Sequence, residues 1–270
     1  MQTEDLLKRL DLAIERSRAG DYEWALRELE NLESASEHPQ DIAALRFFQA
    51  TCLTDLGRSE EALERISLVD KNKLAFANQI DYEYEYARIE RALGRTQQAL
   101  DRVLTTLQTI AKAGTSHKDE IDIVSRNLHT MRGILLAESG KCGEAMPLLE
   151  AVPKEDEGWA EAKLLLGDCS FKIRQYREAI DHYLSLISLT AKVTPVIRNG
   201  AQRNIGYAYH QLGEYVKAAE YLLKVKDAYD EYPSLKADLY RLLASAYLHL
   251  GMNQEAAKYG GFSRGPRLIQ

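Results

Sequence analysis

The stretch from residue 206 to residue 218, GYAYHQLGEYVKA, contains the pattern that decides the fold. It has a small residue at Gly206, a second glycine at Gly213, and an alanine five residues after the second glycine, at Ala218. The spacing of this glycine and alanine recurs along the chain. The pairs are Gly20/Ala25, Gly57/Ala62, Gly94/Ala99, Gly140/Ala145, Gly213/Ala218 and Gly251/Ala256, and a seventh copy has Arg174 in place of the glycine before Ala179.

The copies follow one another at steps of 37, 37, 46, 34, 39 and 38 residues between the alanines. Two further positions keep their character in every copy: the residue twelve before the alanine is small, and the residue directly after it is apolar. The small residues are Ala13, Ala50, Ala87, Gly133, Gly167, Gly206 and Ala244. Agreement at three fixed offsets in seven copies indicates a genuine internal repeat.

Each repeat has the features of two antiparallel helices, A and B, joined by a tight turn. Small residues let two helices approach closely, and a glycine can end helix A in the left-handed conformation. Asp21, Ser59 and Thr96 then stand where a side chain can cap the following helix B. The sequence therefore predicts an all-α chain of about seven helix pairs over residues 1–259, followed by an irregular tail over residues 260–270.

The pattern resembles the tetratricopeptide repeat, in which a small residue, an aromatic residue, an alanine and a second aromatic residue follow in order. The best copies are Leu166-Gly167, Tyr176, Ala179 and Tyr183, then Gly206, Tyr209, Gly213, Tyr215 and Ala218, then Ala244, Tyr247, Gly251 and Ala256. The resemblance covers roughly residues 3–259, and the first and third copies depart from it with Arg16 and Glu90 at the aromatic position. It implies a right-handed superhelical solenoid whose A helices line a concave groove.

The resemblance also implies where a partner would bind, because groove residues in this family lie at set positions around the small residue of helix A. Asn127 lies one helical turn before these positions and is included with them. The candidate partner-binding groove is then Tyr84, Arg88, Arg91, Asn127, Thr130, Asp168, Phe171, Arg203, Tyr207, His210 and Arg241. Arginine and tyrosine are enriched among the energetic anchors of interfaces, and arginine binds carboxylates with two parallel hydrogen bonds. We therefore expect a protein-interaction scaffold or adaptor that holds an acidic peptide or helix of a partner protein. The alternative is a solvated face whose arginines pair with local acids.

Composition and motifs argue against several other classes of protein. Thirty-five Lys and Arg against 41 Asp and Glu give a net charge of −6, which disfavours binding of nucleic acid through its phosphates. The sequence has no phosphate-binding glycine loop, nucleophile elbow or His-Glu-x-x-His motif, and its six histidines are scattered over different repeats. We therefore expect no enzyme activity, no cofactor and no metal. No apolar run is long enough to span a membrane, and the first residues do not have the pattern of a leader.

Three cysteines without a Cys-x-x-Cys pair predict that no disulfide framework forms and favour a reducing, cytoplasmic location. Cys52 and Cys169 each lie two residues after the small residue of a helix A, so we expect both to be buried. Cys142 falls in the turn before the fourth helix B, where we expect it to be exposed.

Two other functions remain open from the sequence. A repeat array generally needs a polar cap on its last apolar face, and none is evident before the tail. The chain could therefore be a structural component that self-associates through its C-terminal end. The other alternative is a sensor module for a peptide or small molecule.

Overall fold

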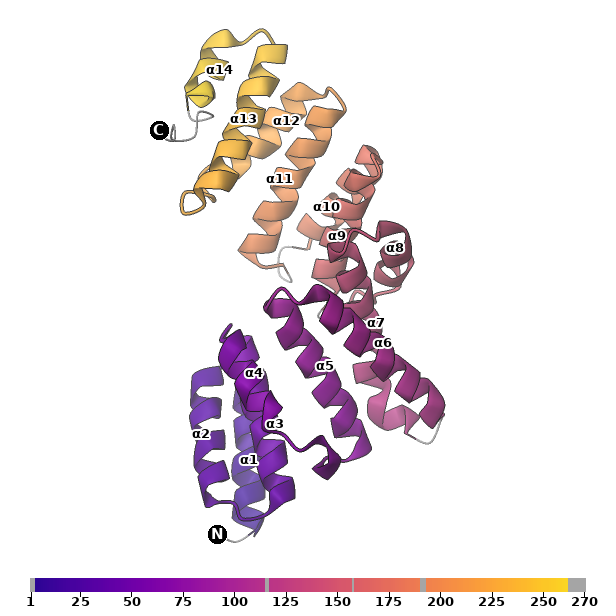
Figure 1. The fold of residues 1–270 in the computed structure, drawn as a ribbon. Helices are drawn as coiled ribbons and strands as arrows, with labels where there is room; N and C mark the ends of the chain where they lie inside the picture. The colour runs from indigo at the N-terminus through magenta and orange to yellow at the C-terminus, as the bar shows by residue number, and fades with distance from the viewer. Residues whose placement is uncertain (1–2, 115–116, 157, 190–192, 262–270) are drawn as a thin grey trace, which may run out of the picture. The chain divides into compact units, whose positions relative to one another are not determined.

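The computed structural model describes residues 3–114, 117–156, 158–189 and 193–261, and the side chains from residue 7 on. Within these ranges the chain forms fourteen α-helices, one short 3-10 helix and no strand (Figure 1). The helices are α1 (Thr3–Arg18), α2 (Tyr22–Ala35), α3 (Pro39–Asp55), α4 (Ser59–Ser67), η1 (Lys71–Lys73), α5 (Phe76–Ala92), α6 (Thr96–Ala113), α7 (Lys118–Glu138), α8 (Cys142–Glu150), α9 (Trp159–Lys172), α10 (Tyr176–Ile187), α11 (Pro195–Gln211), α12 (Tyr215–Lys224), α13 (Pro233–His249) and α14 (Asn253–Gly260). The predicted all-α helical-repeat fold is confirmed.

The chain divides into two compact units, residues 1–139 (unit 1) and residues 140–270 (unit 2), and each is described by itself. In unit 1, α1/α2, α3/α4 and α5/α6 pack as pairs, and each second helix also packs on the next pair. In unit 2, α8 packs on α9, and the pairs α9/α10, α11/α12 and α13/α14 follow. The A helices also contact one another, α3 with α5 and α5 with α7 in unit 1, and α9 with α11 and α11 with α13 in unit 2.

Some features predicted for the whole chain stay predictions. They are the single domain over residues 1–259 and the right-handed sense of its superhelix. Of the predicted tail, Gly260 is the last residue of α14, and residues 262–270 lie outside the described ranges.

The repeated glycines end the A helices in the way that the sequence predicts. Gly20, Gly57, Gly94, Gly140, Gly213 and Gly251 all have positive φ angles, between 72° and 89°. In the turn at Gly213 the amide of Glu214 donates a hydrogen bond to the carbonyl of Tyr209, at 2.9 Å. This bond, which spans the last turn of the helix, is typical of a glycine-terminated helix end.

Arg174 takes the place of the glycine and also its conformation. Its φ is 65°, and the amide of the next residue, Gln175, donates to the carbonyl of Ser170 at 2.8 Å. A side chain in this left-handed region costs about 1–2 kcal/mol. Arg174→Gly removes this cost but gives the unfolded chain more freedom, so we expect the free energy of unfolding to rise by about 0.5–1 kcal/mol.

Urea unfolding of the full chain measures this effect, with Gly213→Arg as the matched reverse substitution. The reverse variant should be less stable than the wild type. A lower stability for Arg174→Gly would show that the arginine side chain contributes more at this turn than its backbone costs.

The structure corrects the predicted helix caps. Asp21 precedes α2, but its side chain makes no capping hydrogen bond; it accepts one from Arg16 Nη1 at 2.7 Å instead. Ser59 and Thr96 are already the first residues of α4 and α6. The tight glycine turns leave the preceding residue, rather than these hydroxyls, at the cap position.

The structure also corrects the prediction for two cysteines. Cys52 and Cys169 are buried as expected, each 1% exposed. Cys142, expected in an exposed turn, is the first residue of α8 and is only 6% exposed. It forms a disulfide with Cys169 of α9, and the two Cα atoms are 5.3 Å apart. The prediction that no disulfide forms was wrong, because the packing of α8 on α9 brings together cysteines from two different repeats.

Candidate partner-binding site

In unit 1 the predicted groove arginines meet at a hollow between three A helices. The hollow has a volume of about 360 Å³ and is lined by Thr54 of α3, Arg88 and Arg91 of α5, and Met131 and Glu138 of α7, among others. Three further predicted groove residues of this unit, Tyr84 on α5 and Asn127 and Thr130 on α7, are partly buried and do not line it.

Both arginines are paired with carboxylates of a neighbouring A helix, and Arg88 also with one of its own helix. Arg88 donates to Glu85 at 2.8 Å and to Asp55 at 2.7 Å, and Arg91 donates to Glu138 at 2.6 Å. Burial opposes the charge of Arg88, yet Glu85 and Asp55 hold its pKa above the ordinary value. These two arginines therefore follow the alternative interpretation, in which they pair with local acids.

In unit 2 three predicted residues line one pocket of about 230 Å³ between α9, α10 and α11. They are Asp168 and Phe171 of α9 and Tyr207 of α11. The rings of Phe171 and Tyr207 meet edge to face, with centroids 6.0 Å apart and planes at 87°. Tyr176 of α10 also packs edge to face against Phe171, with ring centroids 5.2 Å apart.

Two residues that the sequence did not single out for the site complete the pocket. Tyr183 of α10 donates its hydroxyl to Asp168 Oδ1 at 2.5 Å, and Asn204 of α11 donates its amide to the same oxygen at 2.8 Å. Tyr183 can pass over α9 because residue 167 is a glycine, and a Cβ there would overlap the tyrosine ring. The repeat pattern contains this glycine and tyrosine, but does not show that the hydroxyl reaches Asp168.

Asp168 is the only acidic residue in the lining of this pocket. Burial raises the pKa of its carboxyl group, although Tyr183, Asn204 and the more distant charges of Lys172 and Arg203 favour the ionised form. The pKa of Tyr183 is raised as well, by its burial and then by the neighbouring carboxylate. The pocket therefore places a carboxyl group, held by two neutral donors, beside aromatic rings.

The remaining predicted residues of unit 2 lie outside the pocket lining. Arg203 donates to Asn204 Oδ1 at 3.1 Å and lies 5.6 Å from the centre of the Tyr229 ring. His210 contacts Ser245 at 2.9 Å, and burial followed by the charge of His249 lowers its pKa. Arg241 is exposed and donates to Asp238 at 3.0 Å.

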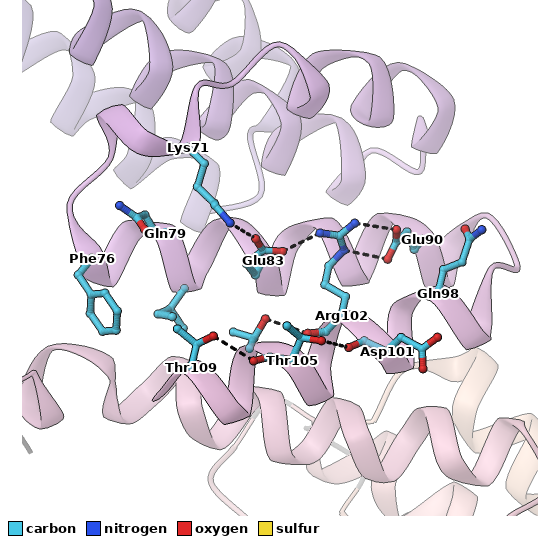
Figure 2. A pocket seen from close by; sticks show the side chains of 12 residues that line it. Lys71, Phe76, Gln79, Glu83, Glu90, Gln98, Asp101, Arg102, Thr105 and Thr109 are labelled. Atoms are coloured by element: carbon cyan, nitrogen blue, oxygen red, sulfur yellow. Dashed lines mark hydrogen bonds and ion pairs between the residues drawn. The ribbon is translucent and has the colours of Figure 1, made fainter. Parts of the chain in front are cut away.

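A larger hollow, of about 530 Å³, lies elsewhere in unit 1 between η1, α5 and α6 and was not predicted (Figure 2). The helix that precedes it, α4, has 9 residues, whereas α6 has 18. Because α4 is short, the segment with η1 that follows it leaves one face of the longer α6 uncovered. Figure 2 shows Thr105 and Thr109 on this face, opposite Gln79 and Glu83 of α5.

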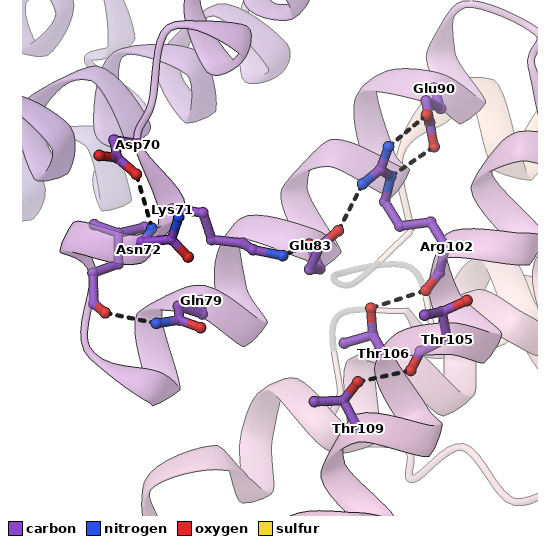
Figure 3. A network of polar contacts seen from close by, with 11 residues as sticks. Asp70, Lys71, Asn72, Gln79, Glu83, Glu90, Arg102, Thr105, Thr106 and Thr109 are labelled. Carbon is purple, nitrogen blue, oxygen red and sulfur yellow. Dashed lines mark hydrogen bonds and ion pairs between the residues drawn. The ribbon is translucent and has the colours of Figure 1, made fainter.

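Four charged residues of this hollow, Lys71, Arg102, Glu83 and Glu90, are paired with one another (Figure 3). Lys71 donates to Glu83 at 2.6 Å, Arg102 donates to Glu83 at 2.6 Å, and Arg102 also holds both oxygens of Glu90. Burial opposes the charge of Arg102, but Glu90 and Glu83 raise its pKa above the ordinary value. Its guanidinium also lies 3.8 Å from the centre of the Tyr86 ring. This network joins η1, α5 and α6. Asp101, the other charged residue of the lining, has no ion pair in the described residues and accepts a hydrogen bond from Gln97 at 2.8 Å.

In the described residues, no group of three or more His, Cys, Asp or Glu side chains is placed to hold a metal ion. None of the described helices is long and apolar enough to cross a membrane.

Comparison with known proteins gives a family match and a set of similar folds. The tetratricopeptide repeat family matches residues 10–67 and 130–192. A signal-transduction ATPase with a tetratricopeptide repeat sensor from Pyrococcus horikoshii has a TM-score of 0.67 at 16% identity, over 96% of this chain and 42% of that one. A Rap protein complexed with Competence and Sporulation Factor has a TM-score of 0.66 at 12% identity, over 95% of this chain and 75% of that one.

A tetratricopeptide repeat protein from Parabacteroides merdae is similar over nearly the full length of both chains. Its TM-score is 0.56 at 18% identity, and the match covers 98% of this chain and 96% of that one. No curated protein matches the chain in sequence. At these identities the structural matches show the fold alone.

Proposed function

Because this chain is a tetratricopeptide repeat protein, we propose that it is a non-enzymatic scaffold or adaptor that binds a segment of a partner protein. The pocket of Asp168, Phe171 and Tyr207 in unit 2 holds an anchor side chain of that segment. The observation that carries the proposal is that three residues predicted for the groove line one open pocket between neighbouring helices.

The chemistry of the pocket supports a protein ligand. Aromatic side chains offer a large contact area with few rotatable bonds, and they are enriched among interface anchors. Phe171 packs edge to face against both Tyr176 and Tyr207, so the pocket wall is formed before the ligand arrives. A preformed wall reduces the ordering that binding requires. The similar Rap protein is complexed with Competence and Sporulation Factor, which is consistent with ligand binding on a fold of this kind.

The acidic character expected of the partner depends on the groove arginines. Arg88, Arg91 and Arg241 are already paired with carboxylates. Arg203 has no ion pair with a carboxylate in the described residues. An acidic group of the partner therefore binds at Arg203, on α11, the helix that also carries Tyr207.

The test is the double substitution Phe171→Ala/Tyr207→Ala in the full chain. Partners captured from native lysate by the wild-type chain are identified, purified and titrated against both proteins. Truncation of a hot-spot residue typically costs about 2 kcal/mol or more of binding free energy. We therefore expect the affinity for the partner to fall by at least about tenfold.

The matched control is Val196→Ala/Val216→Ala, which shortens two exposed apolar side chains outside the pocket. This variant should bind like the wild type. Circular dichroism must show that both variants keep their helices. Equal affinity of the pocket variant and the wild type would refute the pocket as the binding site.

Other expectations stay predictions. Self-association through the C-terminal end and the tail over residues 260–270 is one of them, and residues 262–270 lie outside the described ranges. The exclusion of nucleic acid is another. The cytoplasmic location loses its argument from cysteine usage, because two of the three cysteines form a disulfide.

A further inference from the structure

We propose that the Asp168 pocket selects a basic side chain, lysine or arginine, as the anchor of the partner segment. This inference rests on the proposed function and names the ligand chemistry of its site. It adds a basic anchor to the acidic group expected at Arg203, so the partner segment carries both charges.

The hydrogen bonds of Asp168 leave one oxygen for a ligand. Oδ1 accepts from both Tyr183 and Asn204. Oδ2 accepts no hydrogen bond from the described residues, and Asp168 lines the pocket. The two donors fix the orientation of the carboxylate, so a side chain that enters the pocket meets a preoriented acceptor. A charged donor forms the stronger hydrogen bond with such an acceptor.

The walls of the pocket suit the rest of a basic side chain. Phe171, Tyr183 and Tyr207 present ring carbons to the stem of a lysine or arginine, which is apolar. The faces of such rings also attract a cation electrostatically. With a volume of about 230 Å³, the pocket has room for one side chain and not for a helix.

Two cations of this chain compete with the proposed ligand and do not remove the need for it. Arg203 is held by Asn204 Oδ1 and by the ring of Tyr229, and Lys172 is an exposed residue of the pocket lining. Neither forms an ion pair with Asp168 in the described residues. Burial raises the pKa of Asp168 although both charges favour its ionised form, so a cation that donates directly to Oδ2 would stabilise the carboxylate further.

The experiment is an NMR titration of the full chain with three N-acetylated, C-amidated tripeptides, Gly-Lys-Gly, Gly-norleucine-Gly and Gly-Glu-Gly. Norleucine has a straight apolar side chain without the charge. We expect the lysine peptide to shift the amide signals of α9 and α11, with an affinity about fivefold to tenfold above that of the norleucine peptide.

Two variants separate the charge of the pocket from its shape. In Asp168→Asn the side-chain oxygen can still accept from Tyr183 and Asn204, so the fold should persist while the preference for lysine over norleucine disappears. In Lys172→Gln a competing cation is removed, and affinity for the lysine peptide should rise.

Three outcomes would overturn the inference. They are equal binding of the lysine and norleucine peptides, stronger binding of the glutamate peptide, and binding of none of the three. None of them decides the proposed function, which depends on the separate loss of a partner in Phe171→Ala/Tyr207→Ala. One further result would separate the two proposals. A partner that no longer binds Phe171→Ala/Tyr207→Ala but binds Asp168→Asn with wild-type affinity would show that the pocket holds an anchor side chain without selecting for its charge.

Discussion

Reduction of the disulfide between Cys142 and Cys169 is expected to lower the free energy of unfolding of unit 2 by about 3–4 kcal/mol. The two cysteines are 27 residues apart in sequence. A cross-link of this span restricts the unfolded chain, and the chain-entropy estimate is about 3 kcal/mol for a 15-residue loop and more for longer ones. The bond also fastens α8, which has only 9 residues and contains Pro147, to α9.

Urea unfolding of the full chain with and without a thiol reductant measures the effect. Cys142→Ala should unfold at the same urea concentration in both conditions. Cys52→Ala, which removes the third and free cysteine, should keep the response of the wild type to the reductant. A count of one reactive thiol in the unfolded, unreduced protein would confirm the bond. Three reactive thiols and no response to reductant would contradict it.

Gly167→Ala is expected to destabilise unit 2 by about 1–3 kcal/mol, the usual cost of overpacking a filled contact. A Cβ on Gly167 would overlap the ring of Tyr183, whose Cδ1 atom would lie only 2.6 Å away. Tyr183 is 1% exposed, so a shift of its ring disturbs the packing around it. The shift would also pull its hydroxyl from Asp168, so the pocket should lose affinity for its ligand together with stability.

The matched control is Gly200→Ala in α11, where an added Cβ meets no atom within 4 Å. Alanine is favoured over glycine in a helix interior, so this variant should gain about 0.5–1 kcal/mol. Tyr183→Leu tests the cause, because Gly167→Ala should cost less when added to it than when made alone. An equal cost in both backgrounds would show that the tyrosine is not the obstacle.

The repeat pattern predicted the fold because it records local requirements of the backbone and of close helix contacts. The turn glycines mark the positions with positive φ, and even Arg174 adopts this conformation because the surrounding helices fix the turn. The small residue at position 167 marks where Tyr183 crosses α9. Such requirements act within one repeat, so that a single sequence reveals them.

The candidate site could be predicted only as a set of positions on the A helices. Asp168, Phe171 and Tyr207 line one pocket. The sequence did not show that Arg88 would be neutralised by Asp55 of another repeat, or that Asn204 would hold Asp168 from α11. Each of these contacts depends on which side chains of neighbouring repeats come into register.

By itself, therefore, the sequence determined the helix pairs, their turns and the small residues at their contacts, because these follow from backbone conformation and side-chain size. Only the tertiary structure decided which charges are already paired, that Cys142 is buried and bonded to Cys169, and that Tyr183 and Asn204 both donate to one oxygen of Asp168. Electrostatic and covalent partners come from different repeats, and their distance in space is set by the packing of one repeat on the next.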